Sequence, residues 1–592
     1  MADTSDKISA EVIGVYPNKI RIEVSDIKDF KLAEQELKVG SYLKVFDNDN
    51  SQLISIIESF SIENTEDGQR KYIIDSFPLG IIVDEEFKRG SDSIAFPPKE
   101  VKPASKEDIE KIYQSNLKED EKFIFSKLSN NHSVKIPVNG NKFFNKHIAI
   151  VGSTGAGKSH SVARIIQEAI IGKSSTYDGL NNSHIIVFDI HSEYKSAFPK
   201  GKVIGIEDLK LPSWLLNAEE LDSLFLESGD FNNYNQASLL RKLITANKKK
   251  HNSGVAKIFF DSPLKFDIKE VLLALKNLRK ETYNSKSPNR VMIVDDSYTL
   301  TDGKTTTESG LDLSEEEKLE KYFTESCDFH PQKNSNVSKG SYGDGSIDKF
   351  ISRIETKTKQ DRLQFLFSED ANNMDFKESV LQFIGYSPTN SNVTILDLSG
   401  VPFEVLSITV SLISRLLFDF GYYYKRSRME KDPNEKLNSD VPILLVFEEA
   451  HKYAPKSNMA KYKHSLQAIE RIAKEGRKYG ITLMLSSQRP SEISETIFSQ
   501  CNNYIAMRLT NPNDQNYVAR LLPDTLGNLT DSLPSLQAGE ALIIGDSIIM
   551  PSIVQIEKTD TPPSSNDIPY WDLWKEEWKS FDFEEINKNW NK

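Results

Sequence analysis

The 592-residue sequence has few of the features that mark disulfide-stabilised, metal-binding or membrane proteins. Its 2 cysteines, Cys327 and Cys501, are too few for a disulfide framework and fit a reducing compartment. Cysteine and histidine residues nowhere show the spacing of a metal-ligand cluster. The N-terminus lacks the apolar core of a signal peptide, and no apolar run approaches the ~18–20 residues that a transmembrane helix needs. We therefore expect a soluble, cytoplasmic protein with no membrane contact.

Positive charge is also scarce. The 74 lysine and arginine residues stand against 87 aspartate and glutamate residues, which gives a net charge of −13. This balance argues against a protein that coats nucleic acid with its whole surface, because such proteins are basic. It leaves open DNA threaded through a small, locally basic channel. The length predicts roughly three or four domains of ordinary size.

What the sequence does contain is a complete phosphate-binding loop. Residues 152–159 read GSTGAGKS and match the P-loop pattern G-x-x-x-x-G-K-[ST]. A short apolar strand precedes the loop at 147–151, and a helical pattern follows it at 162–166. Glycines let backbone N–H groups turn toward phosphates, and the helix N-terminus adds a partial positive charge there. The residues predicted to bind the nucleotide are Gly152, Ser153, Thr154, Gly155, Ala156, Gly157, Lys158, Ser159 and His160.

Within this loop, two side chains have individual roles. We predict that Lys158 reaches the β- and γ-phosphates of ATP and that the Ser159 hydroxyl binds Mg²⁺.

An apolar strand that ends in two acids supplies what hydrolysis needs beyond binding. The strand predicted at 443–447 runs into Glu448 and Glu449. We predict that Glu448 reaches toward Mg²⁺ and that Glu449 polarises the attacking water as a general base. Adjacent strand residues point to opposite faces, but both acids can face the crevice where the chain turns at the end of the strand. The structural alternative is a solvated acidic turn.

Two further polar residues follow in the next segments of the chain. Gln488 comes directly after the strand predicted at 481–486, and there it could sense the γ-phosphate; a surface amide is the alternative. Arg477 lies at the end of a helix predicted at 464–479, which Gly480 terminates. A cation at a helix C-terminus is favourable by itself, by ~0.3–1 kcal/mol. The functional interpretation is an arginine finger that enters the ATP site of an adjacent subunit.

Composition and periodicity divide the chain into an α/β core and three further regions. Residues 1–100 alternate polar and apolar residues between turn signals and predict a small N-terminal β-barrel. Residues 130–205 and 386–558 alternate short apolar runs with helical patterns, which predicts a parallel-sheet P-loop ATPase core. A mostly helical insertion is predicted at 206–385, and a C-terminal tail at 559–592. The predicted core strands are 147–151, 184–189, 393–398, 443–447 and 481–486.

The tail is rich in tryptophan. Trp571, Trp574 and Trp578 recur at i, i+3 and i+7, one face of a helix, and Trp590 follows. We expect this helix to dock on its own chain. The alternative is a lock onto a neighbouring subunit or partner.

Together these segments resemble the HerA-type ATPases, hexameric DNA translocases of the HerA/FtsK group, over nearly the whole chain. The segments that carry the resemblance, beyond the P-loop, are FDIHSEY (188–194), LPSWLLNAEEL (211–221), FEEAHKYAP (447–455), EGRKYG (475–480) and SSQRPSEIS (486–494). The resemblance implies a RecA-like core and a homohexamer that uses ATP and Mg²⁺ and passes double-stranded DNA through its centre. It also implies a nuclease or a sirtuin-type NADase as effector partner, in defence against phage.

The resemblance also implies residue roles. Catalysis falls to Glu449, Arg477, Gln488 and Lys158, and metal binding to Ser159 and Glu448. Asp189 and Glu193 match the family's D-x-H-G-E-Y motif, but Ser192 replaces its glycine, so their roles are not carried over.

Other functions remain to be weighed against a DNA motor. A ring that binds ATP mainly to assemble and activate an effector, with little translocation, fits the acidic net charge. An ABC-type ATPase requires an LSGGQ-like signature, for which residues 535–539 are a poor substitute. A small-molecule kinase is disfavoured by the motifs beyond the P-loop.

Overall fold

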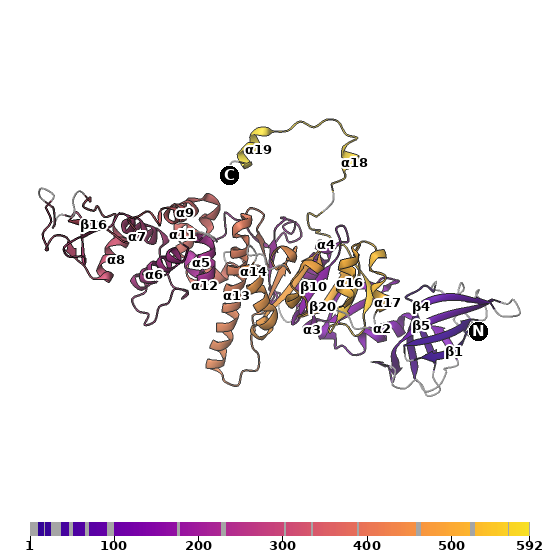
Figure 1. Cartoon of the computed structure of the whole chain (residues 1–592). Coiled ribbons are helices and arrows are strands. Elements are labelled where there is room, and N and C mark those ends of the chain that lie inside the picture. The colour runs from indigo at the N-terminus through magenta and orange to yellow at the C-terminus, as the bar shows by residue number, and fades with distance from the viewer. Residues whose placement is uncertain are drawn as a thin grey trace.

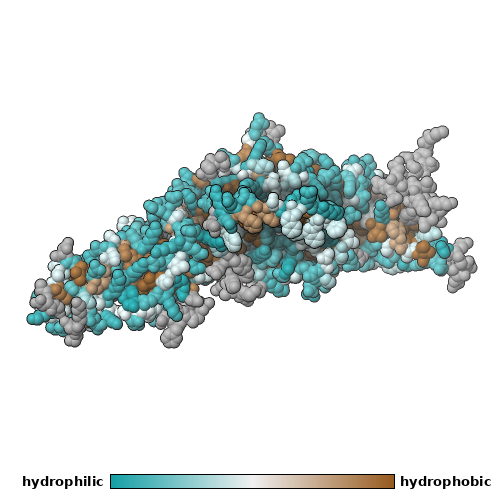
Figure 2. Space-filling view, turned by 90° about the horizontal axis from the view of Figure 1, so that it is seen from above, coloured by the Kyte–Doolittle hydropathy of each residue, from teal (hydrophilic) through white to brown (hydrophobic). Residues whose placement is uncertain are grey.

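The computed structural model shows an elongated molecule with a β-rich region at one end, a central α/β core and a helical region at the other end (Figure 1). The structure describes residues 10–16, 18–24, 37–46, 51–64, 70–90, 100–173, 178–226, 233–295, 297–300, 304–332, 336–386, 390–456, 463–520, 527–565 and 568–590. Polar residues cover most of the face in Figure 2, and apolar ones occur there in small separate groups.

The core is an 11-stranded sheet of order β12-β17-β11-β18-β19-β10-β20-β21-β22-β8-β9. Its parallel strands are β12 (Lys202–Ile204), β17 (Val393–Asp397), β11 (His184–Asp189), β18 (Ile443–Phe447), β19 (Ile481–Ser487), β10 (His147–Val151) and β20 (Cys501–Met507). The five strands predicted from sequence are among them, which confirms the P-loop α/β core. β20 was not predicted, and neither was the antiparallel extension of β21 (Glu540–Gly545), β22 (Ser552–Ile556), β8 (Lys122–Leu128) and β9 (Asn131–Asn139).

Helices cover both faces of the parallel strands, which explains their continuous apolar runs. Residues of β10 alternate between the two cores: Ile148 and Ile150 pack with α4 (Lys158–Ile171), whereas Ala149 and Val151 belong to the cluster of α13 and α14. α13 spans Phe403–Lys431, and α14 spans Lys463–Glu475 and continues into η6 (Gly476–Tyr479). Smaller helices complete the core: α3 (Gly140–Phe144), α15 (Glu495–Phe498), α16 (Pro512–Arg520) and α17 (Gly527–Thr530).

His147 joins the P-loop strand to the helix that leads to Arg477. Its Nε2 donates to the Ala473 carbonyl (2.9 Å), and its Nδ1 accepts from the Leu483 N–H (3.0 Å). Burial lowers the pKa of His147 to about 4, so the ring is neutral at physiological pH. The two contacts fix β10 against α14 and β19.

α13 is long and apolar enough to cross a membrane by length and composition alone. In the window that meets this test, 78% of the residues are buried inside the protein. Its apolar residues pack on the sheet, as in the core helix of a globular protein.

The N-terminal region is an antiparallel sheet of order β1-β2-β5-β4-β3-β7, with β6 paired to β5. Its strands are β1 (Ala10–Tyr16), β2 (Lys19–Val24), β3 (Tyr42–Phe46), β4 (Gln52–Asn64), β5 (Arg70–Val83), β6 (Glu86–Arg89) and β7 (Glu100–Pro103). Strands β1 and β7 approach one another, but the described residues show no hydrogen-bonded ladder between them. The predicted closed barrel therefore remains a prediction. α2 (Lys106–Gln114) leads to the core, where the Tyr113 hydroxyl bonds both Tyr42 and Ser552.

The segment predicted as a helical insertion contains α5 (Ala218–Phe225), α6 (Asn233–His251), α7 (Ile268–Lys280), α8 (Glu315–Thr324), α9 (Asp348–Lys359), α10 (Gln364–Phe367), α11 (Glu369–Asn373) and α12 (Phe376–Leu381). It also contains a four-stranded sheet that the sequence did not reveal, of order β15 (Leu311–Asp312), β14 (Arg290–Val291), β13 (Thr282–Asn284) and β16 (Val337–Lys339).

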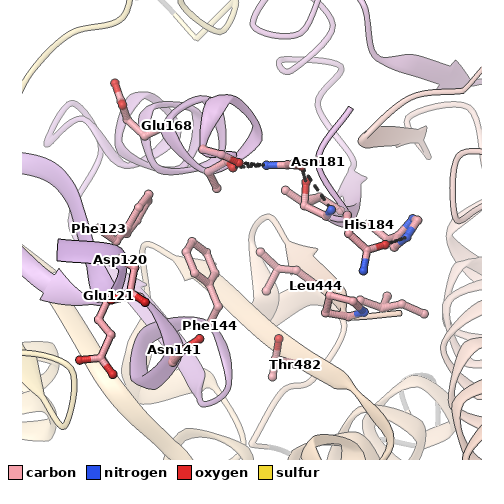
Figure 3. A pocket seen from close by; sticks show the side chains of 18 of the residues that line it. Asp120, Glu121, Phe123, Asn141, Phe144, Glu168, Asn181, His184, Leu444 and Thr482 are labelled. Carbon is pink, nitrogen blue, oxygen red and sulfur yellow. Dashed lines mark hydrogen bonds between the residues drawn. The ribbon is translucent and has the colours of Figure 1, made fainter. Parts of the chain in front are cut away.

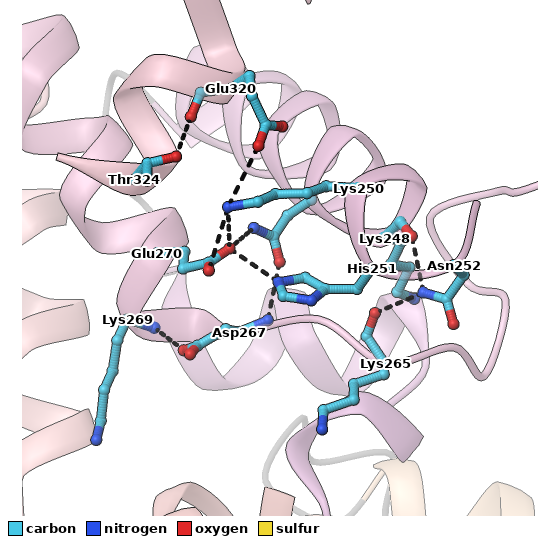
Figure 4. A network of polar contacts seen from close by, with 11 residues as sticks. Lys248, Lys250, His251, Asn252, Lys265, Asp267, Lys269, Glu270, Glu320 and Thr324 are labelled. Atoms are coloured by element: carbon cyan, nitrogen blue, oxygen red, sulfur yellow. Dashed lines mark hydrogen bonds and ion pairs between the residues drawn. The ribbon is translucent and has the colours of Figure 1, made fainter.

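A polar network fastens two of these helices together (Figure 4). Glu270 on α7 accepts hydrogen bonds from Asn247 (2.6 Å) and His251 (2.9 Å) of α6 and forms an ion pair with Lys250. The buried Lys248 donates to the carbonyls of Phe260 and Ser262, both at 2.6 Å. Since this network satisfies its own charges, it accounts for the basic end of α6 without a ligand.

The tail does not dock on its own chain, contrary to our expectation. α18 ends after Tyr570–Leu573, and α19 (Phe583–Trp590) follows a stretch without helix. Trp571, Trp574, Trp578 and Trp590 are 70%, 72%, 97% and 80% exposed, and the segment extends away from the body in Figure 1. Spacing alone could not reveal this, because an apolar helical face implies an apolar surface but does not say which molecule supplies it.

Removing the tail should therefore leave the fold intact. A chain that ends at residue 565 loses side chains that bury almost no area, so we expect its thermal midpoint to stay within about 1–2 °C of the full chain. Differential scanning fluorimetry measures this directly, and a drop of several degrees would show that the tail packs on the body after all.

Candidate functional site

The P-loop has the backbone geometry that phosphate binding requires. Gly155 and Gly157 have φ of +73° and +99°, which L side chains rarely adopt. A Cβ on Gly152 would lie 2.8 Å from the Met507 Cβ, so this position also accepts only glycine. α4 begins at Lys158 directly after the loop, and its N-terminus faces the pocket.

The loop opens on a pocket of about 530 Å³ at the carboxyl edge of the parallel strands. Every polar residue predicted for ATP chemistry lines it except Arg477 and Ser153: Thr154, Lys158, Ser159, His160, Glu448, Glu449 and Gln488. Gly155 and Gly157 line it as well. The sequence-based expectation that both acids face one crevice is thus met by the geometry, while their individual chemical roles remain predictions.

Glu449 turns into the pocket through a strained backbone. Its φ and ψ of 50° and 49° are left-handed, which is uncommon for a residue other than glycine and typical of functional sites. The side chain is only 4% exposed, and its Oε2 makes no hydrogen bond within the described chain, although His451 Nδ1 lies 3.2 Å away. A buried carboxylate oxygen without a donor is suited to accept a proton from water.

Gln488 connects that carboxylate to the P-loop. Its Nε2 donates to Glu449 Oε1, and its Oε1 accepts from the Thr154 hydroxyl at 2.6 Å. The amide therefore lies between the phosphate loop and the candidate base, in the position that a sensor requires. Gln488 therefore has partners in the pocket, and its role as a sensor stays a prediction.

Glu448 is hydrogen-bonded by Tyr194. It is 2% exposed, and its Oε2 accepts a hydrogen bond from the Tyr194 hydroxyl at 2.7 Å. Burial raises the pKa of Glu448 to about 7, an effect that Tyr194 opposes and Glu449 reinforces. Burial also lowers the pKa of the nearby Lys158 ammonium, and the carboxylates of Glu448, Glu449 and Glu193 counteract this.

Glu193 is a site residue for which no role was defined from the sequence. The Ser159 hydroxyl, predicted to bind Mg²⁺, donates to Glu193 Oε2 at 3.0 Å. The motif around residues 188–194 was the available signal, but no spacing rule tells which of its polar residues reaches the P-loop.

The turn that carries Glu193 is held firmly. The fully buried Asp189 carboxylate accepts from the backbone N–H groups of His191 (3.1 Å) and Tyr194 (2.9 Å). Ser192, which stands where the resembling family has glycine, has a φ of +56°. Its hydroxyl donates to Asp397 at 2.8 Å, which offsets the cost of this conformation for a residue with a Cβ.

The segment before the tail forms one wall of the pocket. Gln555, Glu557, Lys558 and Ser565 line it, and the Ser564 N–H donates to the Glu193 carbonyl at 2.8 Å. The chain thus returns to the nucleotide pocket just before the tail leaves the body.

Arg477 lies elsewhere. It is exposed on η6, directly before β19 begins, whereas the P-loop follows the end of the parallel strand β10. Arg477 therefore lies at the amino edge of the sheet and its own P-loop at the carboxyl edge. Within one chain the two cannot form one site.

A second cavity, of about 440 Å³, lies at this amino edge (Figure 3). Phe123, Phe144, Asn181, His184 and Leu444 are among its lining residues. None of the predicted ATP-site residues contributes to it. The His184 ring is already hydrogen-bonded within the protein, since its Nδ1 donates to the Ile384 carbonyl at 2.9 Å.

The donors in the nucleotide pocket fit Mg²⁺. The Ser159 hydroxyl and the carboxylates of Glu193, Glu448 and Glu449 are hard oxygen ligands that line one pocket. In the described part of the chain no three or more His, Cys, Asp or Glu side chains form a closed metal cage. This suits Mg²⁺, which usually keeps waters and phosphate oxygens as ligands.

Comparison with known proteins finds similarity to proteins named as helicases. Residues 123–417 match the family described as "Helicase HerA, central domain". A probable helicase of Methanocaldococcus jannaschii is 26% identical over 593 residues, which cover 96% of this chain and 94% of that protein. The DNA double-strand break repair helicase HerA of Pyrococcus furiosus is 26% identical over 446 residues, which cover 72% and 67%.

Solved structures of low sequence identity also match. VirB4 of Thermoanaerobacter pseudethanolicus aligns with a TM-score of 0.40 at 13% identity, over 75% of this chain and 98% of that one. The plasmid coupling protein TrwB in complex with a non-hydrolysable ATP analogue aligns with a TM-score of 0.41 at 12% identity, over 76% and 93%.

The contact between Ser159 and Glu193 generates a prediction about Mg²⁺. Glu193→Gln keeps the size of the side chain but removes its charge beside the metal position. We expect the Mg²⁺ concentration that half-saturates tight nucleotide binding to rise about 10-fold or more, with metal-free nucleotide affinity unchanged. Fluorescent ADP titrated at several Mg²⁺ concentrations measures both quantities.

Glu557→Gln is the matched control, because Glu557 lines the same pocket but pairs with Lys127. Equal Mg²⁺ dependence in both variants would show that Glu193 has no part in holding the metal.

Proposed function

We propose that the chain is an ATP-hydrolysing enzyme of helicase type and that it works as a homohexameric ring motor on double-stranded DNA, since residues 123–417 match the family described as "Helicase HerA, central domain". The observation that carries the proposal is the link from Thr154 through Gln488 to Glu449. A loop that binds phosphates is connected by one amide to a buried carboxylate, whose second oxygen accepts no hydrogen bond within the described chain and lies 3.2 Å from His451 Nδ1. Such a link can couple the presence of the γ-phosphate to the position of the base.

In this mechanism each residue has a definite task. The P-loop amides and Lys158 bind the phosphates. Ser159, Glu193 and Glu448 would hold or orient Mg²⁺, and the ion would supply positive charge beside the transferred phosphoryl group. Glu449 accepts a proton from the attacking water. Gln488 exchanges its contact with Thr154 for one with the γ-phosphate and so reports whether ATP is intact.

The position of Arg477 supports the ring. Because Arg477 and the P-loop occupy opposite edges of the sheet, Arg477 can complete a site only in a neighbouring copy. There it would stabilise the charge of the transition state, an effect worth 10³–10⁵ in rate for known arginine fingers. His147 supports this arrangement by fixing the turn before Arg477 to the P-loop strand of the same copy.

For the substrate and partner we propose double-stranded DNA in the ring centre and a nuclease or a sirtuin-type NADase as effector, in cytoplasmic antiphage defence. Relatives that match most of this chain are named helicases, and several are named DNA double-strand break repair helicases. The second candidate is an ATP-dependent scaffold that assembles an effector with little translocation. The net charge of −13 favours it, because a motor around DNA needs its positive charge concentrated in the channel.

Replacing Glu449 tests whether its carboxylate is the general base for ATP hydrolysis. We expect Glu449→Gln to bind ATP within a few-fold of the wild type but to hydrolyse it about 10²–10⁴-fold more slowly, since the proton acceptor is gone. Phosphate release, measured with and without duplex DNA, reports the rate and whether DNA stimulates it. Glu492→Gln, an exposed neighbour paired with Arg489, is the control. Normal ATP turnover by Glu449→Gln would show that Glu449 is not the general base. If DNA does not stimulate ATP turnover and the protein does not move along DNA, the ATP-dependent scaffold is favoured.

Mixing two variants tests whether Arg477 acts in the nucleotide pocket of a neighbouring copy. Arg477→Ala should abolish hydrolysis by about 10³-fold while ATP binding persists. Adding Arg477→Ala chains to Lys158→Ala chains should restore part of the activity, because an interface between them joins an intact P-loop to an intact arginine. Lys478→Ala, the exposed neighbour on the same turn, controls for surface charge. Undiminished hydrolysis by Arg477→Ala in an assembled ring would refute the finger.

A further inference from the structure

The exposed tail is an apolar surface that packs on no other part of the chain that the structure describes. Within residues 568–590, large apolar side chains are exposed: Ile568, Tyr570, Trp571, Leu573, Trp574, Trp578, Phe581, Phe583, Ile586 and Trp590. The same segment carries six carboxylates and three lysines. Such a dense apolar and acidic segment is typical of an interaction surface rather than of a solvated end.

The root of this tail is fixed at the rim of the nucleotide pocket. Ser564 donates to the Glu193 carbonyl (2.8 Å), and Ser196 donates to the Pro562 carbonyl (2.8 Å). The tail therefore leaves the body beside the site that Arg477 of another copy would enter.

A second unpartnered surface lies at the far end of α13. This α13 tip, residues 422–437, projects beyond the core in Figure 1. Tyr422, Tyr423, Met429 and Leu437 are 38–63% exposed there. The helical part, 422–431, has four cations (Lys425, Arg426, Arg428 and Lys431) against one carboxylate, Glu430. Arg426 pairs with Glu430, and Arg428 pairs with Glu435 and Asp440, so the excess positive charge rests mainly on Lys425 and Lys431.

The α13 tip adjoins the turn of Arg477. A Cβ on Gly421 would lie 2.6 Å from the Tyr479 carbonyl, which shows how closely α13 approaches η6. The Lys425 ammonium lies 5.5 Å from the centre of the Tyr479 ring. Any surface that receives Arg477 therefore also approaches the α13 tip.

We propose that the tail of one copy docks on the α13 tip of the neighbouring copy in the ring. The proposal rests on the trans role of Arg477 stated above, because that contact brings the root of the tail and the α13 tip to one interface. Both surfaces carry exposed aromatic residues, and their charges are opposite: acidic on the tail and basic on the helical part of the tip. A second copy is thus the occupant that the chain itself complements.

Docking also explains the spacing of the tryptophans. Trp571, Trp574 and Trp578 form one face only in a helix that continues beyond α18, which ends at Leu573. A short isolated helix is marginal in water, and an apolar surface from the neighbour supplies the burial that an extension requires.

The contact is tested by cross-linking in the full chain. Both native cysteines, Cys327 and Cys501, are buried and 3–4% exposed, so their background reaction is low. In the double variant Trp574→Cys with Tyr423→Cys, a short bismaleimide should give a ladder of covalent oligomers. Trp574→Cys with Tyr234→Cys is the matched control, because Tyr234 is 87% exposed on α6, in the helical region at one end of the molecule (Figure 1); it should give no ladder.

A charge exchange provides the second test. Lys425→Glu with Arg426→Glu should raise the chain concentration for half-assembly about 10-fold, and adding Glu576→Lys with Glu577→Lys should restore it. Mass photometry over a dilution series measures assembly. Failure of the second pair to restore assembly, or a ladder from Trp574→Cys alone, overturns the docking of tail on tip.

The outcomes separate the two proposals. Rings whose hydrolysis depends on Arg477 but which give no cross-link refute the docking and leave the motor intact. Absence of any assembly refutes both. Cross-linking of the tail only to a different co-purifying protein assigns the tail to that partner and overturns docking on a second copy.

Discussion

A single buried ammonium organises the nucleotide pocket. Lys158 is 6% exposed, and three carboxylates, those of Glu193, Glu448 and Glu449, raise its pKa against the effect of burial. Without these anions a buried cation would be too costly, and without the cation three carboxylates could not share one pocket. The phosphates of a nucleotide bring new negative charge to the same ammonium. Nucleotide binding therefore changes the electrostatic interaction between Lys158 and all three carboxylates. Each of these carboxylates is connected to a different part of the fold.

The contacts of the three carboxylates couple the nucleotide pocket to other segments of the fold. Glu449 is tied through Gln488 to the P-loop, Glu448 to Tyr194, and Glu193 through its backbone to Ser564. Strands β18, β19 and β10 bring the first groups together, and they are adjacent parallel strands whose carboxyl ends meet at one edge. Small shifts of the acids can therefore reach the segment before the tail without any large change in the packed sheet.

The sequence predicted the core sheet well, because strands buried on both faces leave continuous apolar runs and the P-loop has a strict pattern. It failed at β20 and at the antiparallel extension, where Asn502 and Asn503 interrupt the apolar run and pairing depends on distant segments. For the site, Glu448, Glu449 and Gln488 were found because strand ends share an edge. Glu193 lacked a role because only the left-handed turn at Ser192 aims it at Ser159. The tail was misjudged, since periodicity identifies a face and not its partner.

The placement of Arg477 and the P-loop at opposite edges of one sheet gives any assembly a polarity. A contact between unlike edges is heterologous, so a two-fold symmetric dimer cannot satisfy it. In an open chain of copies, the nucleotide pocket at one end has no neighbouring arginine, and the Arg477 at the other end has no neighbouring pocket. If Arg477 acts in the neighbouring copy as proposed, only closure into a circle removes both ends, and every nucleotide pocket then has an arginine from a neighbour.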